Sequence, residues 1–404
     1  MSAMPGGRTP RVRRLAGTNL QTSGDHNQRV VLHCIRVNPA ASKSDIARIT
    51  GLTHPAVTNI CRRLMDDGLV VTAGQRRGGR GQPATRLEIR AEGAYSIGLN
   101  IDRDHVTMVL VDFVGAPRAR RSMEVPFPLP EQVTGWVATT LPQLLFEAGI
   151  EPAHLTGAGV AMPDQLGDID LPGRTAAFAR WSSVDVADLF PPGFDRPVLA
   201  ENDAAAAAVG EMHFGLGRRY AGFFYLLVTY GLGGGLVVDG LYRRGAHGRS
   251  GEIGLLPTAS GGEVQSVVSL SGLYRELANA GCDAPVPTDD GFAGLNAAAE
   301  AAVERWIADA SDTLLDALVT VVCLIDPDAI LIGGRLPPAI IDRLVQAVSG
   351  KLHASARRMP SPPHVLRAAL ASDASAVGAA ILSFADMLMP SDHSQLPRTA
   401  GIAP

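Results

Sequence analysis

The stretch from His54 to about Asp66 constrains the first part of the chain more than any other segment does. Its apolar residues recur at the spacing i, i+3, i+4, i+7, which predicts an amphipathic helix with one buried side. These residues are Val57, Ile60, Cys61 and Leu64. The opposite side is small, hydrogen-bonding or basic, and it carries His54, Ala56, Thr58, Asn59, Arg62 and Arg63. Such a face suits base edges near the start of the helix and phosphates near its end.

A shorter helix precedes this one across a sharp break. Ser42 and Asp45 have the spacing of a helix N-terminus, where the Ser caps and the carboxylate favours the first turn. Gly51 ends that helix, and Thr53 caps the next. A further helix is predicted upstream, from Asn27 to Val37. Two helices joined by a three-residue break are typical of a helix-turn-helix.

Two predicted strands follow, Leu69 to Thr72 and Arg86 to Ile89, with a glycine-rich basic loop between them. Alone, the loop reads as a solvated hairpin, but after a helix-turn-helix it reads as a wing whose arginines enter a minor groove. We therefore predict a winged helix-turn-helix over residues 25–90 that binds a double-stranded DNA operator. Its DNA-contacting candidates are Ser42, Thr53, His54, Ala56, Thr58, Asn59, Arg62, Arg63, Arg76, Arg77 and Arg80.

The charge distribution agrees with this interpretation. Residues 1–90 hold 15 Lys and Arg against 5 Asp and Glu, although the whole chain has a net charge of −4. Residues 1–24 are rich in Gly, Pro, Thr and Arg and predict a disordered basic arm. No stretch is long and apolar enough for a membrane span, and none resembles a secretory signal, so we expect a cytoplasmic protein without membrane contact. The four cysteines lack the spacing of a disulfide framework or a zinc cluster.

The remaining three hundred residues alternate strands and helices in two rounds, which predicts a two-lobed α/β architecture. Three consecutive strands open the first round, and a buried strand over 221–229 opens the second, where the glycine-rich run 230–235 is expected to end it. The predicted strands are 95–101, 106–113, 118–125, 155–161, 197–200, 221–229 and 329–332. The predicted helices are an Ala-rich helix after Asp203 and the segments 131–147, 297–325, 339–352 and 374–387.

Four segments of this part resemble the ROK family, which unites bacterial sugar kinases and sugar-responsive repressors. They are VLAENDAAAAAVGE at 198–211, YGLGGGLVVDG at 230–240, GAHGRSGEIG at 245–254 and AILIGGRL at 329–336. The resemblance implies an actin-like, ribonuclease-H-like sugar-kinase fold. We expect a first lobe over 91–201, on which a C-terminal helix within 373–388 packs, a second lobe over 202–372 and a flexible tail over 389–404.

The resemblance also implies a carbohydrate effector. Asn202, Asp203 and Glu252 match sugar-contacting positions of the family, and Asp203 matches the general base of its kinases. Purely local roles remain open, with Asn202 or Asp203 as a helix cap and Glu252 as a turn residue. Trp181 matches a family tryptophan, for which buried packing is an equal alternative.

Three departures from the family pattern separate this chain from the kinases. Kinases of the family hold ATP phosphate with an Asp-x-Gly-Gly-Thr turn, but here that turn reads Asn100 to Asp104, without glycine and with two carboxylates. Leu255 replaces a histidine that binds the family zinc and contacts the sugar, and the cysteine cluster is replaced by 261–265. We therefore expect no enzyme activity, no metal or cofactor, and a sugar site altered toward a deoxy, acylated or aryl-substituted sugar, with Gln265 as a further candidate contact.

Three functions are compatible with these residues. The leading one is a repressor, a homodimer or tetramer, whose operator binding is controlled by a carbohydrate effector. The second is a bifunctional sugar kinase that also binds DNA. The third is a DNA-binding repressor with a vestigial pocket.

Overall fold

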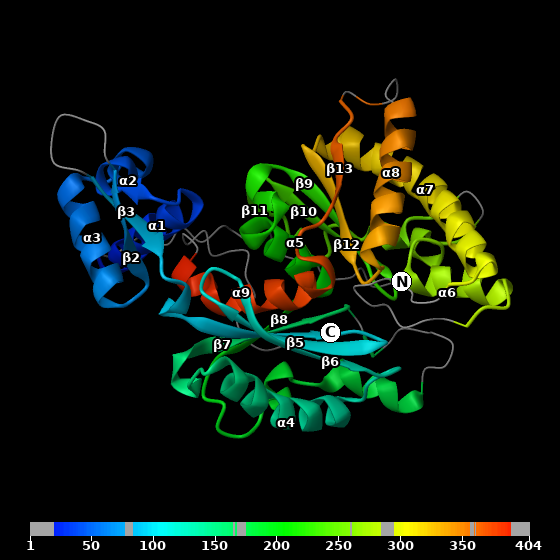
Figure 1. Cartoon of the computed structure of the whole chain (residues 1–404), viewed down its shortest axis with the longest axis horizontal. Coiled ribbons are helices and arrows are strands. Elements are labelled where there is room, and N and C mark those ends of the chain that lie inside the picture. The colour runs from blue at the N-terminus through cyan, green and yellow to red at the C-terminus, as the bar shows by residue number, and fades with distance from the viewer. Residues whose placement is uncertain are drawn as a thin grey trace, which may run out of the picture.

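The computed structural model describes residues 20–76, 84–164, 166–167, 175–258, 261–283, 295–355, 359 and 361–388. It contains three sheets, one in an N-terminal head and one in each of two lobes (Figure 1). The predicted winged helix-turn-helix and the two-lobed α/β fold are both confirmed. None of its described helices is long and apolar enough to cross a membrane. All four cysteines are free thiols.

The head is a three-helix unit closed by a small sheet. It comprises α1 (Leu20–Val37), β1 (Ala41–Ser42), α2 (Lys43–Thr50), α3 (His54–Asp66), β2 (Val70–Arg76) and β3 (Ala84–Ile89), with the strand order β1-β3-β2. Gly51 ends α2 at a φ of 71°, a left-handed conformation that glycine adopts at little cost. The predicted stripe of α3 is buried and packs with Ile46 and Leu87 in the core of the head.

The first lobe has a five-stranded sheet of order β6-β5-β4-β7-β8. Its strands are β4 (Tyr95–Ile101), β5 (His105–Asp112), β6 (Pro117–Glu124), β7 (Leu155–Met162) and β8 (Val198–Asn202). The first three pair antiparallel, and β7 and β8 add in parallel. One face is covered by α4 (Pro130–Ala148) and the other by α9 (Ala374–Leu388), as Figure 1 shows.

The second lobe repeats the same strand order, β11-β10-β9-β12-β13. Its strands are β9 (Phe223–Val228), β10 (Leu232–Val238), β11 (Leu241–Tyr242), β12 (Ala329–Gly334) and β13 (His364–Arg367). Its helices are α5 (Asp203–Phe214), α6 (Leu270–Asn279), α7 (Ala297–Ile325) and α8 (Pro338–Ala354). Because α5 packs both on this sheet and on α9, it lies at the centre of the molecule (Figure 1).

Close approach of helices to the sheets depends on small residues. A Cβ at Gly98 or Gly159 of the first sheet would lie 1.8 or 1.9 Å from a carbonyl oxygen of α9. A Cβ at Gly378 would lie 1.7 Å from the carbonyl oxygen of Ala206 on α5. A larger side chain at any of these glycines would prevent α9 from packing this closely against the first sheet and against α5.

The glycine-rich run after β9 was predicted to end the strand, and this prediction is wrong beyond the first turn. Gly231 lies in the turn, but Gly233, Gly234 and Gly235 belong to β10. Glycine stands at these positions because α5 packs closely on β10. A Cβ at Gly235 would lie 2.4 Å from the Cβ of Ala208 on α5. Elsewhere the predicted elements differ mainly at their ends, as for α1, which begins at Leu20 rather than Asn27.

Candidate DNA interface and effector site

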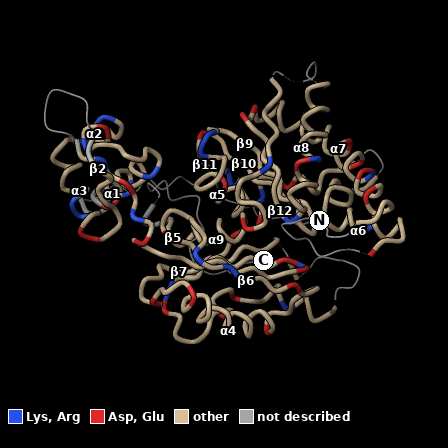
Figure 2. The backbone as a smooth tube through the Cα atoms, in the orientation of Figure 1, with Lys and Arg blue, Asp and Glu red and all other residues tan. Residues whose placement is uncertain are grey.

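The polar side of α3 is exposed, as the sequence predicts. His54, Thr58, Asn59, Arg62 and Arg63 are all exposed, and Ala56 is half-buried. Lys and Arg lie along α2 and α3 of the head (Figure 2), and in Figure 1 α3 lies on the side of the head away from the body. The helix therefore presents a continuous hydrogen-bonding and basic surface to solvent.

Two contacts organise that surface. His54 Nε2 lies 3.0 Å from the hydroxyl oxygen of Ser44, so the start of α3 is tied to α2. Arg62 donates from Nη2 to Asn59 Oδ1 across 3.3 Å. Neighbours that bind each other on a helix face are held in orientation for a ligand. Ser44 is exposed beside His54 and is a candidate contact that the sequence interpretation missed, although its position two residues after the Ser42 cap was a usable signal.

Other predicted DNA contacts have structural roles or lie outside the described residues. Ser42 is buried, and its hydroxyl forms a capping box with Asp45, accepting from the Asp45 amide and donating to its carboxylate. Thr53 is exposed and caps α3 through the amide of Ala56. The side chain of Arg76, at the end of β2, and the residues Arg77 and Arg80 lie outside the described part of the chain.

The predicted effector residues gather where β8 meets α5. Asn202 caps α5, and its Oδ1 accepts from the amides of Ala204 and Ala205 at 3.0 and 3.1 Å. Asn202 also hydrogen-bonds the side chain of Asp164, which follows β7. Asn202 therefore acts as the helix cap that was left open as a local role. It also belongs to a cluster of polar side chains from both lobes that includes Asp164.

That cluster is acidic and partly compensated by arginine. The carboxylate of Asp164 lies 3.9 Å from Nε of Arg249, so a loop of the second lobe meets the first lobe here. Burial, and next the Asp164 charge, raises the pKa of Glu252. Burial likewise raises the pKa of Asp164, against the arginine charges. Carboxylates that pay a desolvation cost and accept hydrogen bonds are suited to sugar hydroxyls.

Asp203 is the most perturbed residue of the site. Its side chain is buried, and its Oδ1 accepts from the amide of Ala204 at 2.8 Å. Burial, followed by the charge of Asp102, raises the pKa of Asp203 to about 7, while Arg103 opposes this shift. Asp102 is itself fully buried, and its Oδ2 lacks a hydrogen-bond partner.

The turn from Asn100 to Asp104 is held by arginines. Arg103 Nη1 lies 3.3 Å from Asp102 Oδ1, and a Cβ on Gly231 would lie 3.3 Å from the same Nη1. The guanidinium therefore lies between this turn and the turn after β9. Arg335, after β12, donates from Nη1 to Asp104 across 2.8 Å and from Nη2 to Glu124 across 2.8 Å. Arg335 thus joins the two lobes, and sequence reasoning missed both arginines because each depends on tertiary contacts.

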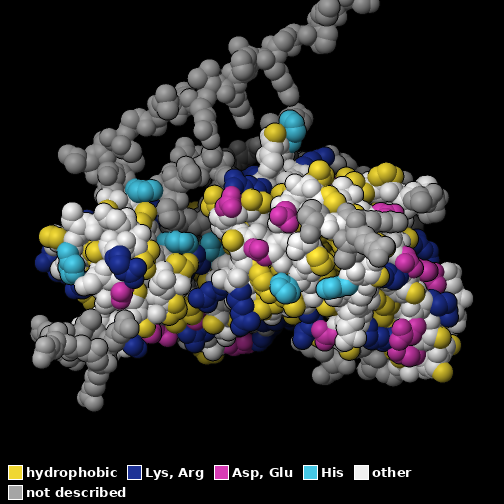
Figure 3. Space-filling view, turned by 90° about the horizontal axis from the view of Figure 1, so that it is seen from above, with side chains coloured by type: hydrophobic (Ala, Val, Ile, Leu, Met, Phe, Trp, Pro, Cys, Tyr) yellow, Lys and Arg dark blue, Asp and Glu magenta, His cyan; other side chains and the backbone are white. Residues whose placement is uncertain are grey.

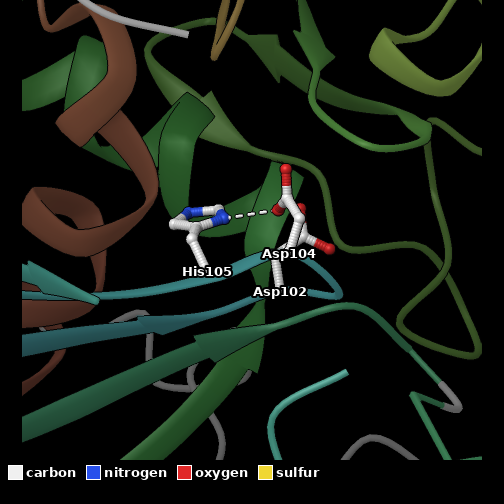
Figure 4. A group of neighbouring side chains, drawn as sticks. All are labelled: Asp102, Asp104 and His105. Atoms are coloured by element: carbon white, nitrogen blue, oxygen red, sulfur yellow. Dashed lines mark hydrogen bonds and ion pairs between the residues drawn. The ribbon is translucent and has the colours of Figure 1, made fainter. Parts of the chain in front are cut away.

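Asp102, Asp104 and His105 are the group of possible metal ligands that the described residues bring together (Figure 4). Nδ1 of His105 lies 2.7 Å from Asp104, and Nε2 lies 3.1 Å from Nδ2 of Asn100. His105 and Arg335 lower the pKa of Asp104 despite its burial. Because both imidazole nitrogens and both Asp104 oxygens have partners, this group is an ion-pair network that offers a metal only the free oxygen of Asp102.

The remaining predicted residues lie at the edge of this region. Gln265 is half-buried and donates to Glu263 across 2.7 Å, and a Cβ on Gly231 would lie 3.4 Å from its Oε1. Leu255 is 51% exposed, so it belongs to the surface more than to an apolar pocket wall. Trp181 is buried, and its indole donates to the carbonyl of Pro128 across 2.8 Å, which agrees with a packing role.

Comparison with known proteins places this geometry in a family. The model described as the ROK family matches residues 96–385, and the model described as the MarR family matches residues 25–81. The protein "Uncharacterized protein y4fQ" of Sinorhizobium fredii is 29% identical over 367 residues, which are 89% of this chain and 90% of that protein. A xylose repressor of Bacillus subtilis is 25% identical over 228 residues, which are 56% of this chain and 59% of the repressor.

Solved structures agree on the fold. A ROK family transcriptional regulator, described as a homologue of the Escherichia coli MLC protein, superposes with a TM-score of 0.64 at 20% identity and covers 91% of this chain and 98% of its own. A ROK family glucokinase of Streptomyces griseus superposes with a TM-score of 0.50 at 21% identity over 72% of this chain and 99% of its own. With a family match over more than half of its length, this chain belongs to the ROK family and carries an N-terminal winged helix of the MarR type.

Proposed function

We propose that this chain is a DNA-binding transcriptional repressor whose operator affinity is controlled by a carbohydrate bound between its lobes. The observation that carries the proposal is the exposed polar and basic face of α3, on a winged helix attached to a ROK body. Relatives that bear the name xylose repressor support it. The protein acts in the cytoplasm as a homodimer or tetramer, and pairs of α3 enter successive major grooves of a palindromic operator.

Asn202, Asp203, Glu252 and, at the rim, Gln265 are the proposed sugar contacts. Asn202 ends β8 of the first lobe and caps α5, Asp203 begins α5, and Glu252 and Gln265 belong to the second lobe. Asp164 joins them from the first lobe. A ligand that binds both lobes changes the population of open and closed states only by its difference in affinity for them. The proposed consequence is a change in the spacing of two DNA-reading heads.

DNA binding by the purified protein to its own upstream region tests this function. Arg62→Ala should weaken binding to all sequences and lower the slope of log K against log salt by about one, as a phosphate contact requires. Asn59→Ala should relax the preference at one base pair by about 1–3 kcal/mol. The control Arg305→Ala changes an exposed arginine on α7 and should leave the salt dependence of binding and the base-pair preference unchanged.

A panel of sugars added to the complex then tests effector control. Release by one sugar, lost in Asn202→Ala and Glu252→Gln, supports the proposal. Specific DNA binding that no sugar alters, with no sugar raising the melting temperature, supports a vestigial pocket, because a ligand that binds the native state must stabilise it. The absence of specific DNA binding contradicts the repressor function itself. Tight glucose binding in calorimetry would contradict the altered sugar specificity.

The alternative of a bifunctional kinase has one observation in its favour. Asp203, at the position of the kinase general base, has its pKa raised to about 7, which suits proton abstraction near neutral pH. Phosphoryl transfer also requires a phosphate cradle, and here Asp102, Asp104 and two arginines fill the corresponding turn. We therefore propose a non-catalytic protein. An ATP-coupled assay with the same sugar panel should show no turnover. Turnover by the unmodified protein that is lost in Asp203→Asn would instead support the kinase function.

A further inference from the structure

Four basic side chains of the head and the body lie close enough for their charges to act on one another. His33 and Arg36 lie near the end of α1, His213 lies in the last turns of α5, and Arg218 lies in a 3-10 helix (Leu216–Arg219). We call these four residues the junction cluster. Figure 3 shows histidine side chains at the surface between the head and the body.

Two buried nitrogens of the junction cluster have no hydrogen-bond partner among the residues that the structure describes. Nη2 of Arg36 lies 3.2 Å from Nδ1 of His33, but the buried Nε of Arg36 has no acceptor. His213 is only 6% exposed, and its Nε2 has no partner either. Buried polar atoms in native proteins nearly always have a partner, and the exceptions often mark a missing ion or ligand. Arg218 is exposed and connects the cluster to solvent.

The charges of the cluster are uncompensated. Within the described residues, no carboxylate forms an ion pair with Arg36 or Arg218. Glu211, on the same helix as His213, uses its two oxygens on the amides of Leu216 and Leu370 at 2.8 and 2.6 Å. Arg36 is half-buried, and a cation that is partly removed from water without a counterion is costly, so the arrangement is incomplete as it stands.

Burial and the neighbouring basic groups shift the pKa values of these side chains downward. Burial, and then Arg36, lowers the pKa of His33 to about 4. Burial, and then Arg36 and His33, lowers the pKa of His213 far below its usual range. Burial and the Arg218 charge lower the pKa of Arg36 to about 10. A bound anion would reverse these electrostatic effects and draw protons onto the histidines.

We propose that the junction cluster binds the phosphate group of a small metabolite, which bridges the DNA-binding head and the body. A tetrahedral oxyanion accepts hydrogen bonds from a guanidinium and from protonated imidazoles, and its charge supplies the counterion that the protein lacks. The site is separate from the proposed sugar site but shares a helix with it, because Asn202 caps the start of α5 and His213 lies near its end. Both ligands therefore act on one rigid element between effector and head.

DNA phosphate is the other possible source of the same chemistry. The structure favours a small ligand, since α1 lies between α3 and the body in Figure 1, whereas the exposed face of α3 points away. The experiment separates the two sources by measuring the anion without DNA.

Calorimetry of the full chain with inorganic phosphate and with sulfate tests the proposal. We expect one saturable site per chain. Sulfate, whose charge is constant between pH 6 and 8, should bind with proton uptake and severalfold more tightly at pH 6. Arg36→Met and His213→Leu should each weaken binding at least tenfold, Arg36→Lys should weaken it less, and the exposed control Arg305→Met should not change it.

Three outcomes would overturn the proposal. They are no saturable binding, binding that is equal in the wild type and Arg36→Met, and binding without proton uptake. If the wild type binds no phosphate but Arg36→Met loses DNA affinity, the cluster binds the DNA backbone instead of a small ligand. Arg36→Lys, together with thermal unfolding of each variant, distinguishes a lost site from a lost fold.

Discussion

At the scale of single residues, the environment decides what a side chain does more than its identity. Asn202 matches a sugar-contacting position, yet two of its hydrogen bonds cap α5. Ser42, which the sequence places beside the DNA-reading helix, is buried in a capping box. Asp203 begins a helix, where a carboxylate is normally stabilised, but burial and Asp102 outweigh that effect and raise its pKa.

The Asp203→Asn variant tests this balance. Folding raises the pKa of this carboxyl from 3.8 to about 7, so the folded state binds the proton more tightly than the unfolded state. The contribution of Asp203 to the free energy of unfolding is therefore fully present below about pH 4 and is lost as the pH rises to about 7. Asp203→Asn should leave stability almost unchanged at about pH 4 or below and raise it at pH 8 by at most about 4 kcal/mol.

Urea unfolding at the two pH values measures this difference. The control Asp309→Asn changes an exposed carboxylate of α7, and its effect on the free energy of unfolding should be the same at both pH values. An equal gain in stability from Asp203→Asn at pH 4 and at pH 8 would mean that ionisation of this carboxyl carries no cost in the folded protein.

At the scale of elements, the turn between β4 and β5 and the end of β12 meet through charges. Arg335 extends from the end of β12 in the second lobe to Asp104 and Glu124 in the first, and His105 completes the network. Such a contact between lobes orients one sheet on the other.

Arg335→Ala should therefore destabilise the protein by roughly 1–3 kcal/mol, since Asp104 would be left buried without its guanidinium partner, although Glu124 is exposed enough to be solvated. Chemical denaturation measures the loss. Arg343→Ala provides the matched control, because Arg343 pairs with the exposed carboxylates of Glu300 and Glu304 and its loss should cost less than about 1 kcal/mol. Equal losses in the two variants would refute a special role for Arg335.

Gly98 tests the contact between β4 and α9. Gly98→Ala places a Cβ 1.8 Å from the carbonyl oxygen of Ala376, so backbone must shift and we expect a loss of roughly 3 kcal/mol or more. Gly135→Ala, in α4, meets no atom within 4 Å and should stabilise by about 0.5–1 kcal/mol through helix propensity. Thermal unfolding of both variants checks the pair, and opposite signs are the expected result.

At the scale of the whole molecule, function depends on how a basic head is carried by an acidic body. The head holds the exposed arginines of α3, whereas the chain as a whole has a net charge of −4. The basic head is therefore attracted to a polyanion, and the net negative charge of the rest of the chain adds long-range repulsion that favours one orientation on DNA. Strong salt dependence and a defined binding orientation follow from this division.

Two-fold assembly is the prediction at this scale. Sedimentation of the full chain with a duplex of its upstream region should show an even number of chains per duplex. Footprinting should show two protected half-sites about one or two helical turns apart, because one α3 reads one major groove. A single chain on an asymmetric site would contradict the proposed dimeric repressor.

The sequence by itself determined the elements with strong local signals. The stripe of α3, the Ser42 and Thr53 caps and the triplet of strands opening the first lobe follow from periodicity and capping, which act over a few residues. The family signatures then predicted where the Asn202 region would lie. The glycine run 230–235 misled because a glycine can end a strand or admit a helix, and only the partner helix decides between these roles.

Tertiary structure alone decided the contacts between distant segments. Arg335 forms ion pairs with Asp104 and Glu124, which are more than two hundred residues away, and the charge of Arg36 in the head acts on His213 in the body. No local sequence pattern indicates either interaction. Long-range electrostatics and burial depend on which surfaces meet, and therefore on the complete packing of helices and sheets. The same packing buries Asp203 and raises its pKa, and it leaves Arg36 Nε and His213 Nε2 without a hydrogen-bond partner among the described residues.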